Sequence, residues 1–302
     1  MTTLNQYKIY QVDAFTRNKL SGNPAGVVTN ADSLTDIQMQ QIARELNNSE
    51  TAFILHPTTD QADIRIRFFT PTTEVPICGH ATIGANFARA IENNLSSQTI
   101  IQQTEAGNLP IHIEKTSDSY QITMTQGEIV VDDPLSNNIQ TEILQALGIT
   151  EEQRDHTCPM ALASTGAPKI MIAVNNLETL DNLEPDLEAL KAITPKINCN
   201  GYFVFVMTPN QTKLVHARMF SPANGIPEDP VTGNANGPLG AYLIKYNLVK
   251  TTGDLFEFSI IQGEKIKRPG TMHVKVYLDK GKPIKIQIIG DAVIAFATTI
   301  EI

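Results

Sequence analysis

The stretch from Glu74 to Thr82 (EVPICGHAT) places a cysteine, a glycine and a histidine in a row behind a proline. A thiol can act as a nucleophile or an acid–base group, and an imidazole can move protons or bind a metal ion. The same residues also suit the start of a helix. Cys78 and His80 therefore leave three interpretations open: a catalytic thiol, a metal ligand, or a helix start that needs small residues.

Histidine spacing disfavours the metal interpretation. Metal sites usually show as closely spaced His and Cys pairs, and no paired Cys or acidic motif accompanies any histidine of this sequence. No Gly-x-Gly-x-x-Gly stretch or P-loop is present either, so we expect no metal and no cofactor. The six histidines are His56, His80, His112, His156, His216 and His273.

A second copy of this pattern lies in the other half of the chain. Arg67 to Pro71 (RFFTP) recurs as Arg218 to Pro222 (RMFSP). In both copies a Cys/Thr-Gly-x-Ala step follows, beginning at Cys78 and at Thr232, and then a helix-like stretch. Short matches arise by chance, but their shared order favours two similar halves.

The glycine of each step, Gly79 or Gly233, is expected at a helix start. A helix N-terminus has unpaired N–H groups and the positive end of the helix dipole, so it attracts anions. Two such starts facing each other would hold a small anionic molecule between the halves. The alternative is that each glycine only permits a turn.

Several elements that position these residues can be predicted from periodicity. Asp63 to Phe69 alternates as a half-buried strand does, and Thr35 with Gln38 forms a capping box ahead of a helix with apolar residues at helical spacing. Asp279 to Lys282 predicts a tight turn between strands, and a helix is expected around Asp186 to Ile193.

Composition excludes several classes of protein. A chain of 302 residues usually forms two domains, and a net charge of -9 argues against a nucleic-acid partner. The N-terminus resembles no signal peptide, and the longest apolar run, Ala292 to Ala297, is too short to span a membrane. We expect a cytoplasmic protein whose three cysteines stay reduced.

Longer motifs resemble the PhzF-like family of phenazine-biosynthesis-type isomerases, in particular bacterial members of unassigned substrate. That family resembles diaminopimelate epimerase, which implies an α+β fold of two pseudo-symmetric halves, each a mixed β-sheet curled around a central helix. The expected halves are residues 1–125, completed by 292–302, and residues 126–291. The resemblance also implies a biosynthetic role and a homodimer. Its motifs are VDAFT (12–16), SGNPAGVV (21–28), NNSETAF (47–53), RFFTPTTEVPICGHAT (67–82) and EDPVTGNANGPLGAYL (228–243).

The resemblance assigns roles to particular residues. Glu50 matches the family's acid–base glutamate, His80 a polar group that assists proton movement, and Asp229 an aspartate that binds substrate. Five further residues are expected to contact the substrate: Cys78, Gly79, Thr232, Gly233 and Asn234. Compared with the phenazine enzyme, which has Ala, Pro and Ser there, this chain has Cys78, Ala81 and Asn234, so the phenazine precursor is a doubtful substrate.

The expected function is a cofactor-independent isomerase that moves a proton between carbons of a small anionic metabolite. Related epimerases use two cysteines, one per half, but here the second is Thr232, whose hydroxyl is far too weakly acidic. A single base at Glu50 suits a hydrogen shift on one face of the substrate. The alternatives are an epimerase or racemase that uses Glu50 and Cys78, and a catalytically silent ligand-binding protein of the same fold.

Overall fold

The computed structural model describes residues 5–207 and 214–302, and the chain divides into two compact units. Unit 1 comprises residues 1–125 and 289–302, and unit 2 comprises residues 126–288. The long strand β17 (Lys282–Glu301) begins in unit 2 and ends in unit 1. In the described part of the chain, no helix is both long and apolar enough to cross a membrane.

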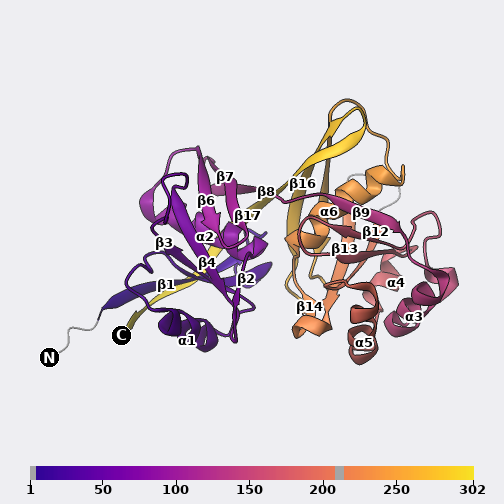
Figure 1. Cartoon of the computed structure of the whole chain (residues 1–302), viewed down its shortest axis with the longest axis horizontal. Helices are drawn as coiled ribbons and strands as arrows, with labels where there is room; N and C mark the ends of the chain where they lie inside the picture. Colours follow the sequence, from indigo (N-terminus) through magenta and orange to yellow (C-terminus); the bar gives the residue numbers. More distant parts are fainter. Residues whose placement is uncertain (1–4, 208–213) are drawn as a thin grey trace. The chain divides into compact units, whose positions relative to one another are not determined.

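Unit 1 is a mixed sheet with the helix α2 (Gly79–Asn93) packed against it (Figure 1). Ten of the 15 residues of α2 are buried, and the helix contacts the strands β1, β2 and β8. A helix that is apolar on nearly all sides must be enclosed by other elements. The other elements of unit 1 are β1 (Gln6–Ala14), β2 (Asn23–Val28), α1 (Asp36–Leu46), β3 (Thr51–Leu55), β4 (Ile64–Phe69), β5 (Glu74–Val75), β6 (Gln98–Thr104), β7 (Gly107–Lys115) and β8 (Tyr120–Thr125).

Unit 2 has the same plan around the helix α6 (Gly233–Lys245), which contacts β10 and β16. Eleven residues of α6 are buried. The other elements are β9 (Val130–Pro134), α3 (Asn137–Leu147), β10 (Ala161–Ser164), β11 (Lys169–Ala173), α4 (Leu177–Asp181), α5 (Leu187–Ile197), β12 (Tyr202–Met207), β13 (Leu214–Ser221), β14 (Ile226–Asp229), β15 (Leu255–Gln262) and β16 (Gly270–Asp279), with short 3-10 turns at Glu151–Gln153 and Pro222–Asn224.

Strand pairing shows that the two units are copies of one fold. In unit 1, neighbouring strands alternate between antiparallel and parallel pairing, beginning and ending with an antiparallel pair, in the order β1-β2-β3-β4-β6-β7. In unit 2, β10-β11-β12-β13-β15-β16 pair in the same alternation. Parallel neighbours are joined by helices or long crossovers, as such pairs require. The predicted α+β fold of two alike halves around central helices is confirmed.

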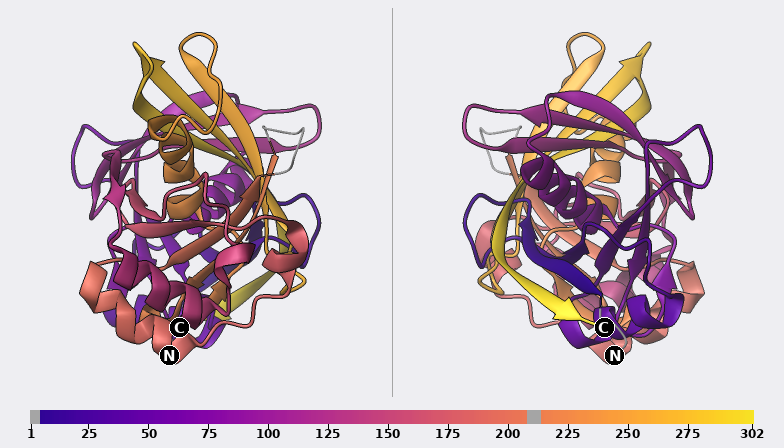
Figure 2. Two further views of the ribbon diagram at one scale, coloured as in Figure 1. Left: turned by 90° about the vertical axis from the view of Figure 1, so that its right-hand side faces the viewer. Right: turned by 90° about the vertical axis from the view of Figure 1, so that its left-hand side faces the viewer.

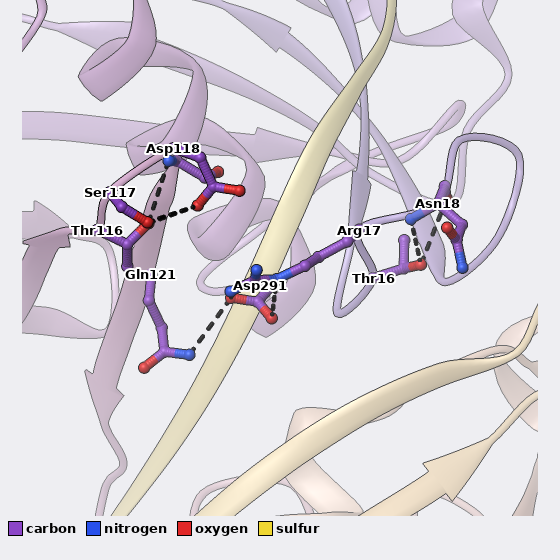
Figure 3. A network of polar contacts seen from close by, with 9 residues as sticks. Thr16, Arg17, Asn18, Thr116, Ser117, Asp118, Gln121 and Asp291 are labelled. Atoms are coloured by element: carbon purple, nitrogen blue, oxygen red, sulfur yellow. Dashed lines mark hydrogen bonds and ion pairs between the residues drawn. The ribbon is translucent and has the colours of Figure 1, made fainter.

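The chain end completes unit 1. The last part of β17 pairs antiparallel with β1, from Ala14↔Ala292 to Gln6↔Glu301, and Figure 2 shows the yellow end of the chain beside the indigo strand. Asp291 fixes this segment, because its carboxylate accepts from Arg17 Nε at 2.9 Å and from Gln121 Nε2 at 3.3 Å (Figure 3). These contacts join the loop after β1, the strand β8 and β17 within unit 1.

Local predictions from the sequence mostly hold. The capping box at Thr35 is present, since Thr35 and Gln38 bond each other's backbone N–H groups. Strand β4 buries Ile64, Ile66 and Phe68, as its alternation predicts. The helix α1 differs from its apolar pattern at one position, because Ile37 is 70% exposed and lies off the buried face. Asp279 and Lys282 flank the predicted turn between β16 and β17.

Candidate active site

The segment that carries Glu50 lies between α1 and β3. Asn47 adopts the left-handed conformation (φ 54°) and ends α1, which turns the chain toward β3. The Glu50 carbonyl then accepts from Gly26 N at the start of the parallel β2–β3 pairing. The backbone of Glu50 is thereby held beside the sheet, and its side chain remains 17% exposed.

His80 is the second residue of α2 and contacts the Glu50 carboxylate. Its Nε2 atom lies 3.4 Å from Glu50 Oε2 and 3.3 Å from Ser49 Oγ, and its side chain is 8% exposed. A carboxylate and an imidazole at this separation can share or relay a proton after small side-chain movements. Two residues predicted to act together are therefore neighbours in the structure.

Cys78 completes this cluster. It is the N-cap residue of α2, makes no side-chain cap bond, and its Sγ lies 3.4 Å from His80 Nδ1. Residue spacing alone does not predict this contact, because side chains two residues apart on a regular helix point in different directions. It arises here because Cys78 has extended backbone (φ -143°, ψ 124°) while His80 is already helical.

The three side chains could also hold a metal ion. Glu50, Cys78 and His80 each offer a ligand atom, and these atoms lie within 4.8 Å of one another. Carboxylate, thiolate and imidazole are all zinc ligands. The sequence interpretation that no paired Cys or acidic motif surrounds any histidine does not hold for His80, because the fold brings Glu50 beside it from a different part of unit 1.

The matching region of unit 2 is a polar network at the start of α6. Thr232 is the N-cap residue of α6, and its hydroxyl donates a short hydrogen bond to the Asp229 carboxylate. Buried Gln262 donates to the Asp229 carbonyl at 2.7 Å and to Thr232 Oγ1 at 3.0 Å. The Asp229 carboxylate therefore orients the Thr232 hydroxyl.

The remaining predicted contact residues lie at the same two helix starts. Gly79 and Gly233 are the first residues of α2 and α6, and Asn234 follows as a partly buried residue. Glu50, Cys78, Gly79 and His80 thus belong to unit 1. Asp229, Thr232, Gly233 and Asn234 belong to unit 2.

An arginine–glutamate pair that was not predicted from the sequence precedes each helix start in the chain. Arg67 binds Glu74 through two hydrogen bonds of 2.7 Å, and Arg218 binds Glu228 through bonds of 3.0 and 2.8 Å. Bidentate pairs of this kind are strong and directional. The pair with Glu74 raises the pKa of Arg67. The sequence repeat could have indicated these pairs, because EVPICG, which begins at Glu74, and EDPVTG, which begins at Glu228, align without a gap.

The position equivalent to Glu50 in unit 2 is Gly201. The parallel pairs Gly26↔Thr51 and Ile170↔Tyr202 set this equivalence, and Ile170 N donates to the Gly201 carbonyl as Gly26 N does to Glu50. Gly201 has φ +151°, and a Cβ atom there would lie 2.7 Å from both the Phe220 carbonyl and Met219 Cε. Unit 2 therefore has no room for a second glutamate.

Comparisons with known proteins show the family of the chain. A family model described as phenazine biosynthesis-like protein (PhzC-PhzF) matches residues 12–298. The chain belongs to the PhzF family. An uncharacterized isomerase of Clostridium acetobutylicum is 49% identical over 294 residues, which cover 97% of each chain. A trans-2,3-dihydro-3-hydroxyanthranilate isomerase of Pseudomonas chlororaphis is 32% identical over 93% of this chain and 95% of that one.

Solved structures place this PhzF-family isomerase in a wider fold group. A PhzF-family protein of Bacillus anthracis superposes with a TM-score of 0.88 at 31% identity, covering 99% of this chain and all of that one. A hydroxyproline epimerase of Agrobacterium vitis has a TM-score of 0.65 at 14% identity, covering 98% and 92%. The second likeness shows the shared fold alone, which is the epimerase-like fold predicted from the sequence.

Proposed function

We propose that this PhzF-family isomerase moves a proton between two carbons of a small anionic metabolite, with Glu50 as both acid and base and without a cofactor. The contact between the Glu50 carboxylate and His80 supports this role most directly. A single carboxyl group can remove a proton from one carbon and return it to another, provided that both carbons present the same face.

The difference between the units favours isomerisation over inversion of a stereocentre. Inversion requires proton-transfer groups on both sides of one carbon, as a pair of thiols would provide. In unit 2 a glycine stands at the position of Glu50, and Thr232 at the position of Cys78. A threonine hydroxyl is too weakly acidic to replace a thiol in proton transfer. One proton-transferring carboxylate therefore suits a shift on one face.

The substrate is expected to carry a carboxylate. The Pseudomonas relative is named for an anthranilate derivative, and helix starts such as those of α2 and α6 favour anions. Residues Cys78, Ala81 and Asn234 differ from the residues that the phenazine enzyme has there, so a different carboxylate is proposed as the natural substrate. Asp229 and Thr232 are proposed to contribute polar contacts to it.

Deuterium incorporation tests the proposal. The protein is incubated in D₂O with trans-2,3-dihydro-3-hydroxyanthranilate and a panel of unsaturated carboxylic acids, and the products are followed by NMR. We expect solvent deuterium at a carbon of a rearranged product, and a loss of roughly 10²- to 10⁴-fold in rate for Glu50→Gln. Glu45→Gln, at an exposed position of α1, is the matched control and should remain active. Full activity of Glu50→Gln would refute the assignment.

The second candidate is an epimerase that uses Glu50 and Cys78, favoured by the 3.4 Å contact between Cys78 and His80. It predicts that Cys78→Ala loses exchange as completely as Glu50→Gln, and that the product has inverted configuration without a shifted double bond. Unchanged exchange in Cys78→Ala eliminates it. A protein that binds members of the panel but exchanges no proton with any of them would be a silent binder.

A further inference from the structure

Lys169, the first residue of β11, is a buried cation outside the residues considered so far. Its relative exposure is 4%. An ammonium group carries three N–H donors, yet within residues 5–207 and 214–302 the Lys169 ammonium makes one hydrogen bond, to the Ala167 carbonyl at 3.4 Å. That bond is longer than an ordinary N–H···O contact. Lys169 thus retains donor capacity that the described residues do not use.

The position of Lys169 is related to that of Glu50 by the internal repeat. In unit 1, Thr51 on β3 pairs with Gly26 on β2, so extending the register by one residue places Glu50 level with Ala25. In unit 2, Tyr202 on β12 pairs with Ile170 on β11, so the same extension places Gly201 level with Lys169. Each unit therefore has one ionisable side chain at the start of its equivalent parallel strand pair. In unit 1 it precedes the second strand of the pair, and in unit 2 it lies on the first strand. Unit 1 carries an acid there, and unit 2 carries an amine.

The charge of Lys169 is not neutralised by an ion pair in the described structure. Burial lowers the pKa of Lys169 to about 8, against the opposing effects of Asp229 and Cys199, which are the ionisable groups that act on it. Asp229 lies near enough to raise the pKa of the amine, but its carboxylate accepts from the Thr232 hydroxyl. A buried cation without a close counter-ion is costly, so an anion beside it would be stabilised.

We propose that Lys169 binds the carboxylate of the substrate, as the anion-recognising residue of unit 2. This inference rests on the proposed function and specifies which residue recognises the charge. One ammonium matches a single negative charge. The negative charge of Asp229 nearby disfavours a phosphate, which carries nearly two charges. In this proposal, Lys169 of unit 2 binds the substrate, while Glu50 of unit 1 transfers the proton.

Acetate and inorganic phosphate are the probes for a direct test. The Lys169 signal is assigned in the full chain by NMR of ¹³Cε-labelled lysine, with Lys169→Arg as the assignment variant, and is titrated with pH in the presence and absence of each anion. We expect acetate to raise the pKa of Lys169 by about one unit, because a bound carboxylate stabilises the ammonium. The signal of exposed Lys191 should not move beyond the general effect of ionic strength, which a chloride series measures. An unchanged Lys169 pKa in acetate would overturn the proposal, as would a larger response to phosphate.

Steady-state kinetics with a substrate from the deuterium panel distinguishes the binding role of Lys169 from the proton-transfer role of Glu50. Lys169→Met should raise KM by roughly 10²-fold with a smaller change in kcat, since it removes binding and leaves the proton-transfer group in place. Lys191→Met should leave both constants unchanged. Loss of kcat alone in Lys169→Met would overturn the binding role. If acetate acts on Lys169 but no panel member exchanges a proton, the proposed isomerase reaction fails while anion recognition stands.

Discussion

The Nε2 atom of His80 lies 3.4 Å from Oε2 of Glu50, and the Nδ1 atom of the same ring lies 3.4 Å from Sγ of Cys78. The imidazole therefore contacts both the carboxylate and the thiol. The chain segment before β3 and the start of α2 meet at this ring.

Replacing His80 should slow proton exchange without unfolding the protein. His80→Asn keeps a polar side chain but removes the ring that contacts Glu50, so we expect a rate loss of about 10²-fold in the D₂O assay. His112→Asn is the matched control, because His112 lies on an exposed face of β7. If the His80 variant exchanges at the wild-type rate while Glu50→Gln does not, His80 has no part in proton movement.

Zinc should inhibit the enzyme at this same cluster. A zinc ion bound by Glu50, Cys78 and His80 would occupy the carboxylate that has to accept the proton. We expect inhibition that a chelator reverses, that magnesium does not reproduce, and that Cys78→Ala weakens by roughly 100-fold because a direct ligand is lost. Cys158→Ala, which removes another buried cysteine, should behave as wild type. Activation by zinc would instead indicate a metal-dependent reaction and contradict the proposed mechanism.

The sequence predicted the fold well because the repeat is encoded in local signals. Arg67 to Pro71 and Arg218 to Pro222 form equivalent strand ends, and the Gly79 and Gly233 steps each begin the central helix of a unit. Helix starts and strand alternation depend on neighbouring residues in the chain, so a single sequence is enough to predict them.

The contacts within the candidate site were less predictable. The approach of Cys78 to His80 depends on the change from extended to helical backbone between them, which residue spacing does not specify. The place of Lys169 beside Gly201 depends on the register of a parallel strand pair. No motif of the sequence singles out Lys169. The register of strands that are far apart in the chain is known only from the three-dimensional structure. Glu50 could be identified from the sequence because a family resemblance includes it.

A side chain at Gly201 should destabilise unit 2. Gly201→Ala introduces a Cβ atom 2.7 Å from the Phe220 carbonyl, at a φ of +151° that L-residues rarely adopt. We expect the free energy of unfolding to fall by about 2–4 kcal/mol in urea denaturation, from backbone strain and overpacking together. Gly166→Ala is the control, since Gly166 has φ +131° but nothing within 4 Å of the added atom. Equal losses in both variants would show that the close contact contributes nothing.

The pH dependence of stability should reveal the buried amine of Lys169. The pKa of Lys169 is about 8 in the folded chain, against the ordinary lysine value of 10.5 in the unfolded chain, so between these pH values the unfolded chain binds more protons than the folded one. The free energy of unfolding of the wild type, relative to Lys169→Met, should therefore rise as pH increases from 8 to 10.5, by roughly 3 kcal/mol, and stay level outside this window. Subtracting the variant removes the contributions of tyrosines and thiols that titrate in the same range. Lys191→Met should show no such difference. Adding acetate should reduce the rise, because an anion that holds the ammonium in its charged form brings the folded-state pKa closer to 10.5. A level difference across the window would show that Lys169 is solvated in the folded protein, and would remove the basis for its role as an anion-binding residue.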